Sequence, residues 1–223
     1  MSERASAPKR PFEPHFRLGR FLRVTAAKLL LALFRTRAID MDRVPRTGGA
    51  ILAGNHVSYA DPVLLWCKAP RHVRFMAKKE LWETGWLGWA LDRVWAFPVR
   101  RGEADRAAIS QATEHLKAGE LVGIFPEGTR TREAEGELGQ AHSGVAFIAT
   151  RAGVPIIPVG IAGTDRIKPP GARVLRFPRV TMCFGEPVRP EDFSSLDKRE
   201  RLEAMTATVM ERIAFELERA RKA

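Results

Sequence analysis

The segment AILAGNHVSYADP, residues 50–62, decides the fold, because it reads as a buried strand, a polar turn and the start of a helix. Residues 50–53 form a short apolar run, which is typical of a buried strand. Asp61 and Pro62 then open a helix that we expect to continue to Lys68, since proline in the first helical turn loses no hydrogen bond. A strand that leads directly into a helix is the repeating unit of an α/β fold.

The same alternation continues to the end of the chain. We expect further strands over residues 73–77, just before residue 99, and over 121–125, 156–161 and 174–184 (one or two strands). We expect helices over residues 81–95, 103–117, 144–151 and 195–221. This pattern predicts a layered α/β fold, in which helices flank a mostly parallel sheet.

The composition excludes several classes of protein. The chain has 223 residues, of which 45% are hydrophobic and 28% charged, so it can bury one sizeable core and is not a disordered protein. Its two cysteines, Cys67 and Cys183, form no CxxC pair, which argues against a zinc ribbon or a disulfide framework and favours a reducing compartment. The histidines lie in unrelated settings, so we expect no metal site.

Positive charge is concentrated at the N-terminus. Residues 1–39 hold nine lysines and arginines against two acids, which accounts for seven of the eleven net positive charges. The apolar run at 24–34 is too short to cross a hydrocarbon core of ~30 Å. We therefore expect a disordered basic lead-in at 1–14, an amphipathic membrane-interface helix at 15–39, and a single domain at 40–223. A helix packed on the protein's own core is the alternative.

The polar turn after the first buried strand holds a candidate catalytic pair. His56 can act as a general base near pH 7, and a carboxylate on its other ring nitrogen would fix the tautomer and stabilise the imidazolium. On a straight helix, His56 and Asp61 would point ~140° apart, so the chain must fold back between them. Asp61 could instead be only the N-cap of the helix that follows.

The segment FPEGTRTR, residues 125–132, follows another predicted strand. Gly128 would let the backbone approach a ligand closely. Arg130 offers a planar guanidinium that matches a phosphate or carboxylate, and Thr129 adds a hydroxyl. A hydrophilic loop is the alternative, but it leaves unexplained why a glutamate, a glycine and an arginine lie together at the end of an apolar strand.

Two further segments lie at predicted strands. FPVRRG, residues 97–102, places two adjacent arginines after a strand, and both cannot face a core. One of them is therefore free for an anion, unless the pair is simply solvated. VPIIPVG, residues 154–160, reads as a buried strand with prolines near its ends.

Together these four segments resemble the glycerolipid acyltransferase family, in particular the 1-acylglycerol-3-phosphate acyltransferases. The resemblance runs from about Asp40 to Pro187 in the family's order, and the NHxSxxDP and FPEGTRTR stretches are the specific part of it. It implies the glycerolipid acyltransferase-like α/β fold, here preceded by the N-terminal interfacial helix. One departure is that His142-Ser143-Gly144 stands where the family often has a Lys-x-Gly element.

The resemblance also implies roles for individual residues. His56 would be the general base and Asp61 its partner, and the strand at 154–160 would help to shape the acyl site. The acceptor's glycerol phosphate would be bound by Arg100, Glu127, Gly128, Thr129 and Arg130, with Lys78 as a further phosphate ligand.

The expected reaction is direct acyl transfer to lysophosphatidic acid. The sequence has no GxSxG elbow and no cysteine beside a histidine, so a covalent acyl-enzyme is not expected. The reaction needs no cofactor, only an acyl-CoA or acyl carrier protein thioester as co-substrate. We expect the protein on the cytoplasmic side of the cell membrane, as a peripheral or monotopic protein.

Other functions remain open from the sequence. The acceptor could be another lysolipid or glycerol 3-phosphate, or the protein could be a non-catalytic basic phospholipid-binding module. A nucleic-acid partner is not expected, because the charge is not accompanied by a recognisable DNA- or RNA-binding motif.

Overall fold

The centre of the computed structural model is a seven-stranded sheet with the order β1-β7-β6-β2-β5-β3-β4. The structure describes residues 25, 27–85, 91, 96–99, 106–128, 143–169 and 171–223. The strands are β1 (Arg37–Ile39), β2 (Ala50–Gly54), β3 (Val73–Lys78), β4 (Phe97–Val99), β5 (Leu121–Ile124), β6 (Ile156–Ala162) and β7 (Thr181–Phe184). The α-helices are α2 (Ala60–Lys68), α4 (Arg106–Lys117), α5 (Gly144–Ala152) and α6 (Lys198–Lys222), and the 3-10 helices are η1 (Met41–Arg43), η2 (Lys79–Glu83), η3 (Thr164–Arg166) and η4 (Pro190–Phe193).

Five neighbouring strands of this sheet are parallel. β2 pairs in parallel with both β5 and β6, and β3 pairs in parallel with β5 and β4. β7 runs antiparallel to β6 and brings β1 with it at the edge. The mostly parallel sheet flanked by helices confirms the fold class that the strand and helix pattern predicted.

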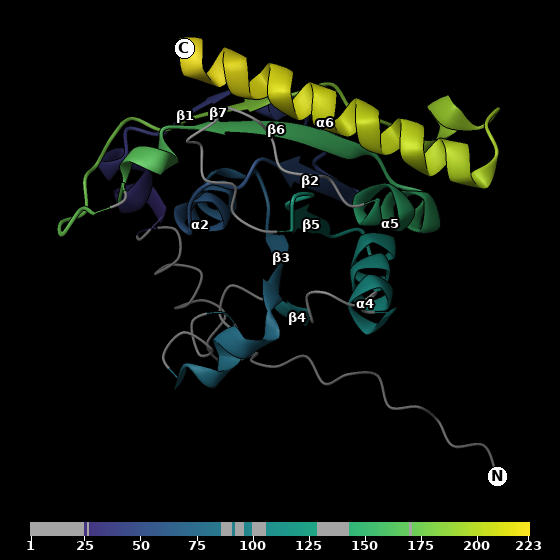
Figure 1. Ribbon diagram of the computed structural model, residues 1–223, viewed down its shortest axis with the longest axis horizontal. Helices are drawn as coiled ribbons and strands as arrows, with labels where there is room; N and C mark the ends of the chain where they lie inside the picture. The colour runs from purple at the N-terminus through teal and green to yellow at the C-terminus, as the bar shows by residue number, and fades with distance from the viewer. Residues whose placement is uncertain are drawn as a thin grey trace.

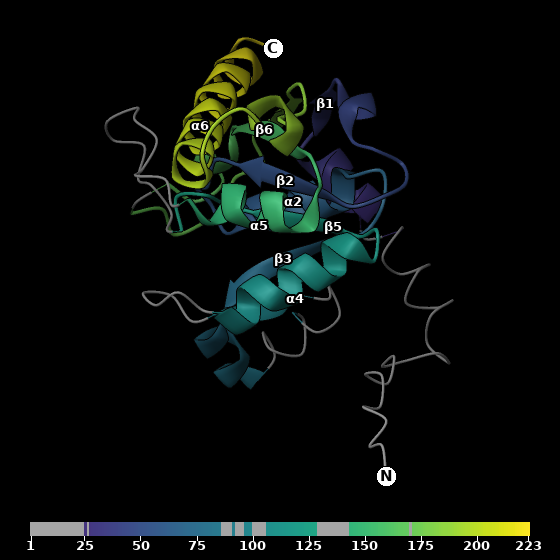
Figure 2. The same ribbon diagram turned by 90° about the vertical axis from the view of Figure 1, so that its right-hand side faces the viewer.

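Both faces of the sheet are covered, as a parallel sheet requires. In β2, Ala50 and Leu52 join the core cluster on the α2 side, while Ile51 and Ala53 join the cluster formed with α4, α5 and α6. Figure 1 shows α6 lying along β6, and Figure 2 shows α4 and α5 side by side. This alternation explains why the strand sequence is apolar at every position.

The N-terminal helix ends earlier than expected, whereas residues 1–24, which hold the expected lead-in and the expected start of the helix, lie outside the described residues. Residues 27–33 are helical, whereas residues 37–39 form β1 and pair with β7, which corrects the expected helix boundary at residue 39. One side of the helix packs on the core through Ala27 and the adjoining Phe34. The other side leaves Leu29 and Leu33 exposed. Within the described residues, no helix is long and apolar enough to cross a membrane.

Two other expected elements differ from the structure. Only Thr181–Phe184 forms a strand in the region 174–184, because Val174 and Leu175 are exposed and have no neighbouring strand to pair with. The helix expected from residue 81 is replaced at its start by η2, and most of its remainder lies outside the described residues.

The C-terminal helix is tied to the first strand by an ionic cluster. Arg219 on α6 donates hydrogen bonds to Asp40, 2.8 Å away, and to the buried Glu216, 2.6 Å away. Arg43 on η1 lies 3.2 Å from the same Asp40 carboxylate. The hydrogen bond from Arg219 holds the pKa of Asp40 below its ordinary value. The cluster therefore fixes the end of α6 beside β1.

We expect Gly160→Ala to lower the free energy of unfolding by about 1–3 kcal/mol or more, because a methyl group must displace α6. A Cβ at this position of β6 would overlap the backbone of Glu216 and Leu217. Gly144→Ala is the matched control, since a Cβ at that position would meet open space and alanine favours a helix. Urea unfolding of the three proteins measures the difference, and equal midpoints would contradict the close α6–β6 packing.

Candidate active site

The sheet brings the ends of four strands to one edge. β2, β3, β4 and β5 are parallel, so Gly54, Lys78, Val99 and Ile124 end at the same side. Ligands bind at this edge in open α/β sheets. The two motifs that the sequence singled out at residues 55–62 and 125–132 begin directly after β2 and β5.

Several predicted site residues lie outside the part of the chain that the structure describes. These are Arg100, Thr129 and Arg130, together with the side chain of Lys78, whose backbone ends β3. His56, Asp61, Glu127 and Gly128 are described, and the geometry of the site is built from them.

The chain folds back between His56 and Asp61, as the pairing of the two side chains requires. Nδ1 of His56 lies 3.0 Å from Oδ2 of Asp61. The same oxygen accepts hydrogen bonds from the backbone N–H groups of Val57, at 2.8 Å, and Ser58, at 2.7 Å. Asp61 is fully buried, and His56 is 8% exposed. One carboxylate oxygen therefore holds both the turn and the imidazole.

The N-cap interpretation of Asp61 is wrong. The N-cap position of α2 is Tyr59, whose side chain makes no capping hydrogen bond, and Asp61 lies inside the first turn. Its carboxylate points back toward the turn that precedes the helix, where Val57 and Ser58 donate to it. Its second oxygen, Oδ1, is buried and has no hydrogen-bond partner among the described residues.

The second motif contacts the first through Glu127. Oε1 of Glu127 accepts a hydrogen bond from the backbone N–H of His56 at 3.2 Å, and this glutamate is only 5% exposed. Gly128 follows with φ of 65°, a left-handed conformation that favours glycine, and its N–H donates to the carbonyl of Phe125. The structure thus places Glu127 against the backbone of His56, and its expected role toward the acceptor stays a prediction.

An aromatic side chain fixes the plane of the imidazole. The ring of Phe125 stacks on His56 with the two ring centroids 4.3 Å apart and their planes 21° apart. Phe75 on β3 in turn stacks with Phe125, with their ring centroids 6.0 Å apart. Phe125 was not predicted as a site residue, although its position as the first residue after β5 was a usable signal.

Asn55 is a second site residue that the sequence analysis left without a role. Its side-chain amide donates to the carbonyl of Ile161 at 3.0 Å, and its amide oxygen accepts from the N–H of Ile161 at 2.7 Å. The side chain therefore continues the pairing of β2 with β6 beyond the end of β2. The sequence signal that could have found Asn55 is its place as a polar residue between a buried strand and the candidate histidine.

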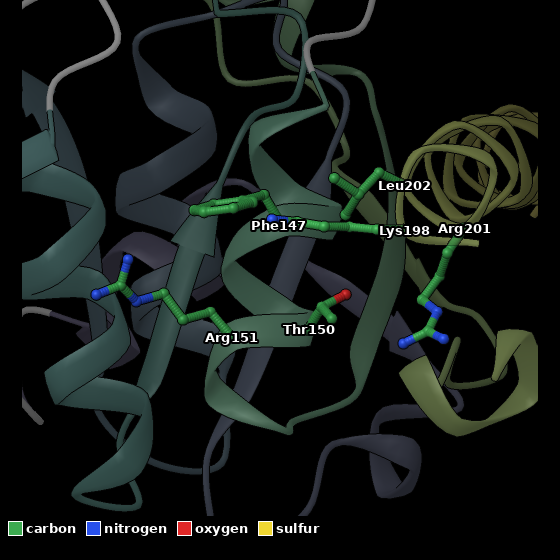
Figure 3. Close-up of a pocket in the computed structure, with 6 residues that line it drawn as sticks. All are labelled: Phe147, Thr150, Arg151, Lys198, Arg201 and Leu202. Carbon is green, nitrogen blue, oxygen red and sulfur yellow. The ribbon is translucent and has the colours of Figure 1, made fainter. Parts of the chain in front are cut away.

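Two other features are separate from this site. A cavity of about 360 Å³ lies between α5 and the start of α6, lined by Phe147, Thr150, Arg151, Lys198, Arg201 and Leu202 (Figure 3). His115, whose pKa is lowered by burial and by Arg74, pairs with Glu120 at the opposite ends of the strands. The described residues include no cluster of His, Cys, Asp or Glu placed to hold a metal.

The comparisons with known proteins agree with one another. The acyltransferase family model matches residues 35–162. A 1-acyl-sn-glycerol-3-phosphate acyltransferase of Bacillus subtilis is 33% identical over 84% of this chain and 92% of its own length, and the protein of that name in Streptococcus pneumoniae is 32% identical over 81% of this chain and 64% of its own. The crystal structure of a 1-acyl-sn-glycerophosphate acyltransferase, PlsC, from Thermotoga maritima matches with a TM-score of 0.71 at 24% identity, covering 93% of this chain and 84% of that one.

Substitutions of Asp61 separate the charge of the carboxylate from its hydrogen bonds. In Asp61→Asn, the amide oxygen can accept all three bonds, and the NH2 group takes the place of the unpartnered Oδ1. We expect this variant to unfold within about 1 kcal/mol of the wild type, whereas Asp61→Ala loses about 2–4 kcal/mol because the donors are left without an acceptor. Urea unfolding measures both, and equal loss in the two variants would contradict the bonding pattern.

Proposed function

Because the chain belongs to the acyltransferase family, we propose that it transfers a fatty acyl group from an acyl thioester to the sn-2 hydroxyl of lysophosphatidic acid. The product would be phosphatidic acid. The relatives from Bacillus subtilis and Streptococcus pneumoniae carry the name of this activity and align over most of this chain, which supports the choice of acceptor.

The observation that carries the proposed mechanism is the His56–Asp61 pair. Since Asp61 holds Nδ1, Nε2 is the ring nitrogen left to take a proton from a substrate. A module that only bound phospholipid would have no need for an imidazole whose tautomer, plane and backbone are all held in place, so the arrangement favours an enzyme over a binding module.

The proposed step is a direct attack. Nε2 of His56 takes the proton of the acceptor's hydroxyl while the hydroxyl oxygen attacks the carbonyl carbon of the thioester. A C–O bond forms and the carbonyl electrons move to oxygen. When this tetrahedral intermediate collapses, the C–S bond breaks, and the proton held by His56 passes to the departing thiolate. The negative charge of Asp61 stabilises the imidazolium in between.

The acceptor's phosphate would be bound by the residues that follow the neighbouring strands. Gly128 ends the described part of the second motif, and Thr129 and Arg130 come directly after it in the chain. Arg100 follows the last residue of β4, and Lys78 ends β3. We propose that these side chains, with Glu127 supporting the loop, recognise the glycerol phosphate, because a guanidinium and a phosphate form paired charge-assisted hydrogen bonds.

The acyl donor would be a thioester of CoA or of acyl carrier protein, and the reaction would take place at the cytoplasmic surface of the membrane. Both the acceptor and the product are lipids, which supports a peripheral or monotopic position. The two cysteines, Cys67 and Cys183, are free thiols, which suits a reducing compartment.

The proposal is tested by measuring acyl transfer from labelled acyl-CoA and acyl carrier protein to a panel of acceptors. The panel contains lysophosphatidic acid, lysophosphatidylcholine, lysophosphatidylglycerol and glycerol 3-phosphate. We expect phosphatidic acid to form with the highest kcat/KM. A preference for glycerol 3-phosphate or for a zwitterionic lysolipid would replace the proposed acceptor, and no transfer to any acceptor would overturn the proposal.

We expect Arg130→Ala to raise the KM for lysophosphatidic acid and to lower kcat/KM by about 10–100-fold, since a charged hydrogen bond contributes ~1.5–3 kcal/mol. The KM for the thioester should change little. Arg130→Lys is the matched control, because it keeps the charge and loses the planar guanidinium. Initial rates with both substrates varied give the two constants, and an unchanged KM for the acceptor would exclude Arg130 from phosphate binding.

A further inference from the structure

The loop between η3 and β7 exposes large apolar side chains to solvent, and the packing of the fold does not account for them. In this segment, residues 167–180, Val174 is 75% exposed, Leu175 is 59% exposed and Phe177 is 47% exposed. Three large apolar side chains exposed so close together on one loop are unusual for a surface that faces only water. They contribute nothing to the core clusters of the described residues.

The loop lies beside the N-terminal helix, residues 27–33. The ring centroids of Phe177 and Phe34 are 5.5 Å apart, and Arg35 donates a hydrogen bond to the carbonyl of Phe177. Figure 1 shows the loop and the helix together at one end of the sheet. The exposed side of that helix carries Leu29 and Leu33, one turn apart. Two segments distant in sequence are therefore in contact, and each of them carries exposed apolar side chains.

The charged side chains of these two segments are all basic. Residues 25–37 and 166–179 together contain eight lysines and arginines and no aspartate or glutamate. Arg173 and Arg176 flank Val174 and Leu175 in the chain, and both arginines are exposed. Exposed apolar side chains flanked by basic ones suit the interface of a bilayer that contains anionic lipids. There the apolar side chains can enter the acyl region while the basic side chains bind the lipid phosphates.

The loop lies at the same edge of the sheet as the site, because β6 is parallel to β2 and the loop joins the end of β6 to the start of β7. The N-terminal helix and α2 share one core cluster, to which Phe34, Leu64 and Leu65 belong. α2 begins just after His56, and Tyr59 before its first turn and Val63 within it are exposed. A membrane that met the loop would therefore lie at the edge of the sheet where the turn with His56 follows β2.

We propose that the loop at residues 171–179 is a membrane-insertion element, which enters an anionic bilayer through Val174 and Leu175 beside the N-terminal helix. The inference rests on the proposed function only in that it assumes a lipid acceptor. Arg173 and Arg176 bind the lipid phosphates, and Phe177 joins the loop to the helix.

Vesicle binding tests the loop directly. We would measure cosedimentation of the full chain with phosphatidylcholine vesicles that contain phosphatidylglycerol, and with phosphatidylcholine vesicles alone. Val174→Ser with Leu175→Ser should weaken binding to the anionic vesicles about tenfold or more, because each inserted side chain favours the apolar phase. Phe215→Ser is the matched control, since Phe215 is 62% exposed on α6 and its loss should leave binding unchanged.

The arginines are tested in the same assay. Arg173→Gln with Arg176→Gln should weaken binding to anionic vesicles by about 25-fold at low salt, since each basic residue contributes roughly fivefold. Binding of this variant should depend less on salt than that of the wild type. Wild-type affinity in either double variant would overturn the proposal.

A fluorophore reports insertion itself. In a Cys67→Ser background, Leu175→Cys labelled with an environment-sensitive dye should shift to the blue with anionic vesicles and be quenched by lipid-borne quenchers. The same dye at Ser195→Cys, in the exposed turn before α6, is the control and should not respond. If the dye at residue 175 stays in water when vesicles are added, the loop does not insert and the proposal is overturned. A blue shift that grows with protein concentration in the absence of vesicles would also overturn it, because the loop would then bind a second copy of the chain.

Failure of the inference and failure of the proposed function can be told apart. Vesicle binding is measured without substrate, so it does not depend on catalysis. With a short-chain lysophosphatidic acid dispersed as monomers, Val174→Ser with Leu175→Ser should keep the wild-type rate, and with the acceptor embedded in vesicles the rate should fall with binding. Loss of transfer to both forms of acceptor would mean that the loop acts on the site and not through the membrane.

Discussion

A single carboxylate oxygen organises the functional end of this protein. Oδ2 of Asp61 accepts from the imidazole of His56 and from two backbone N–H groups of the turn between them. A buried carboxylate is costly unless it is hydrogen-bonded, and the turn supplies the bonds that offset this cost. The same bonds set the path of the chain from β2 into α2, so the conformation of the turn and the orientation of the histidine cannot change independently.

The rest of the sheet is built to hold that turn in place. Asn55 bonds to both backbone groups of Ile161 on β6, and Glu127, after β5, accepts from the N–H of His56. Phe125 stacks on the imidazole from the same strand end as Glu127. The turn that holds His56 is therefore attached to the strands on both sides of β2. Preorganisation of this kind suits the general base that we propose, which must act on a weakly acidic hydroxyl.

The sequence predicted the alternation of elements well, because strands buried on both faces are continuous apolar runs and the helices between them are amphipathic. From the sequence alone, Asp61 could equally be a helix N-cap, because an aspartate followed by proline is common at the start of a helix. Only the structure shows that its carboxylate points back toward the turn and that the N-cap position belongs to Tyr59. The contact between Glu127 and His56 joins residues 71 positions apart, and no local pattern encodes it. The apolar residues at 174–177 suggested a strand, but a strand needs a neighbouring strand, and here the exposed residues have none.

The central claim is that His56, held by Asp61, takes the proton of the acceptor's hydroxyl. The most direct measurement is the initial rate of acyl transfer from a labelled acyl thioester to lysophosphatidic acid by the wild type and by His56→Ala, with urea unfolding of both proteins. We expect the folded variant to lose ~10²–10⁴-fold in rate, the usual cost of removing a general base. A folded His56→Ala protein that turned over at the wild-type rate would contradict the claim.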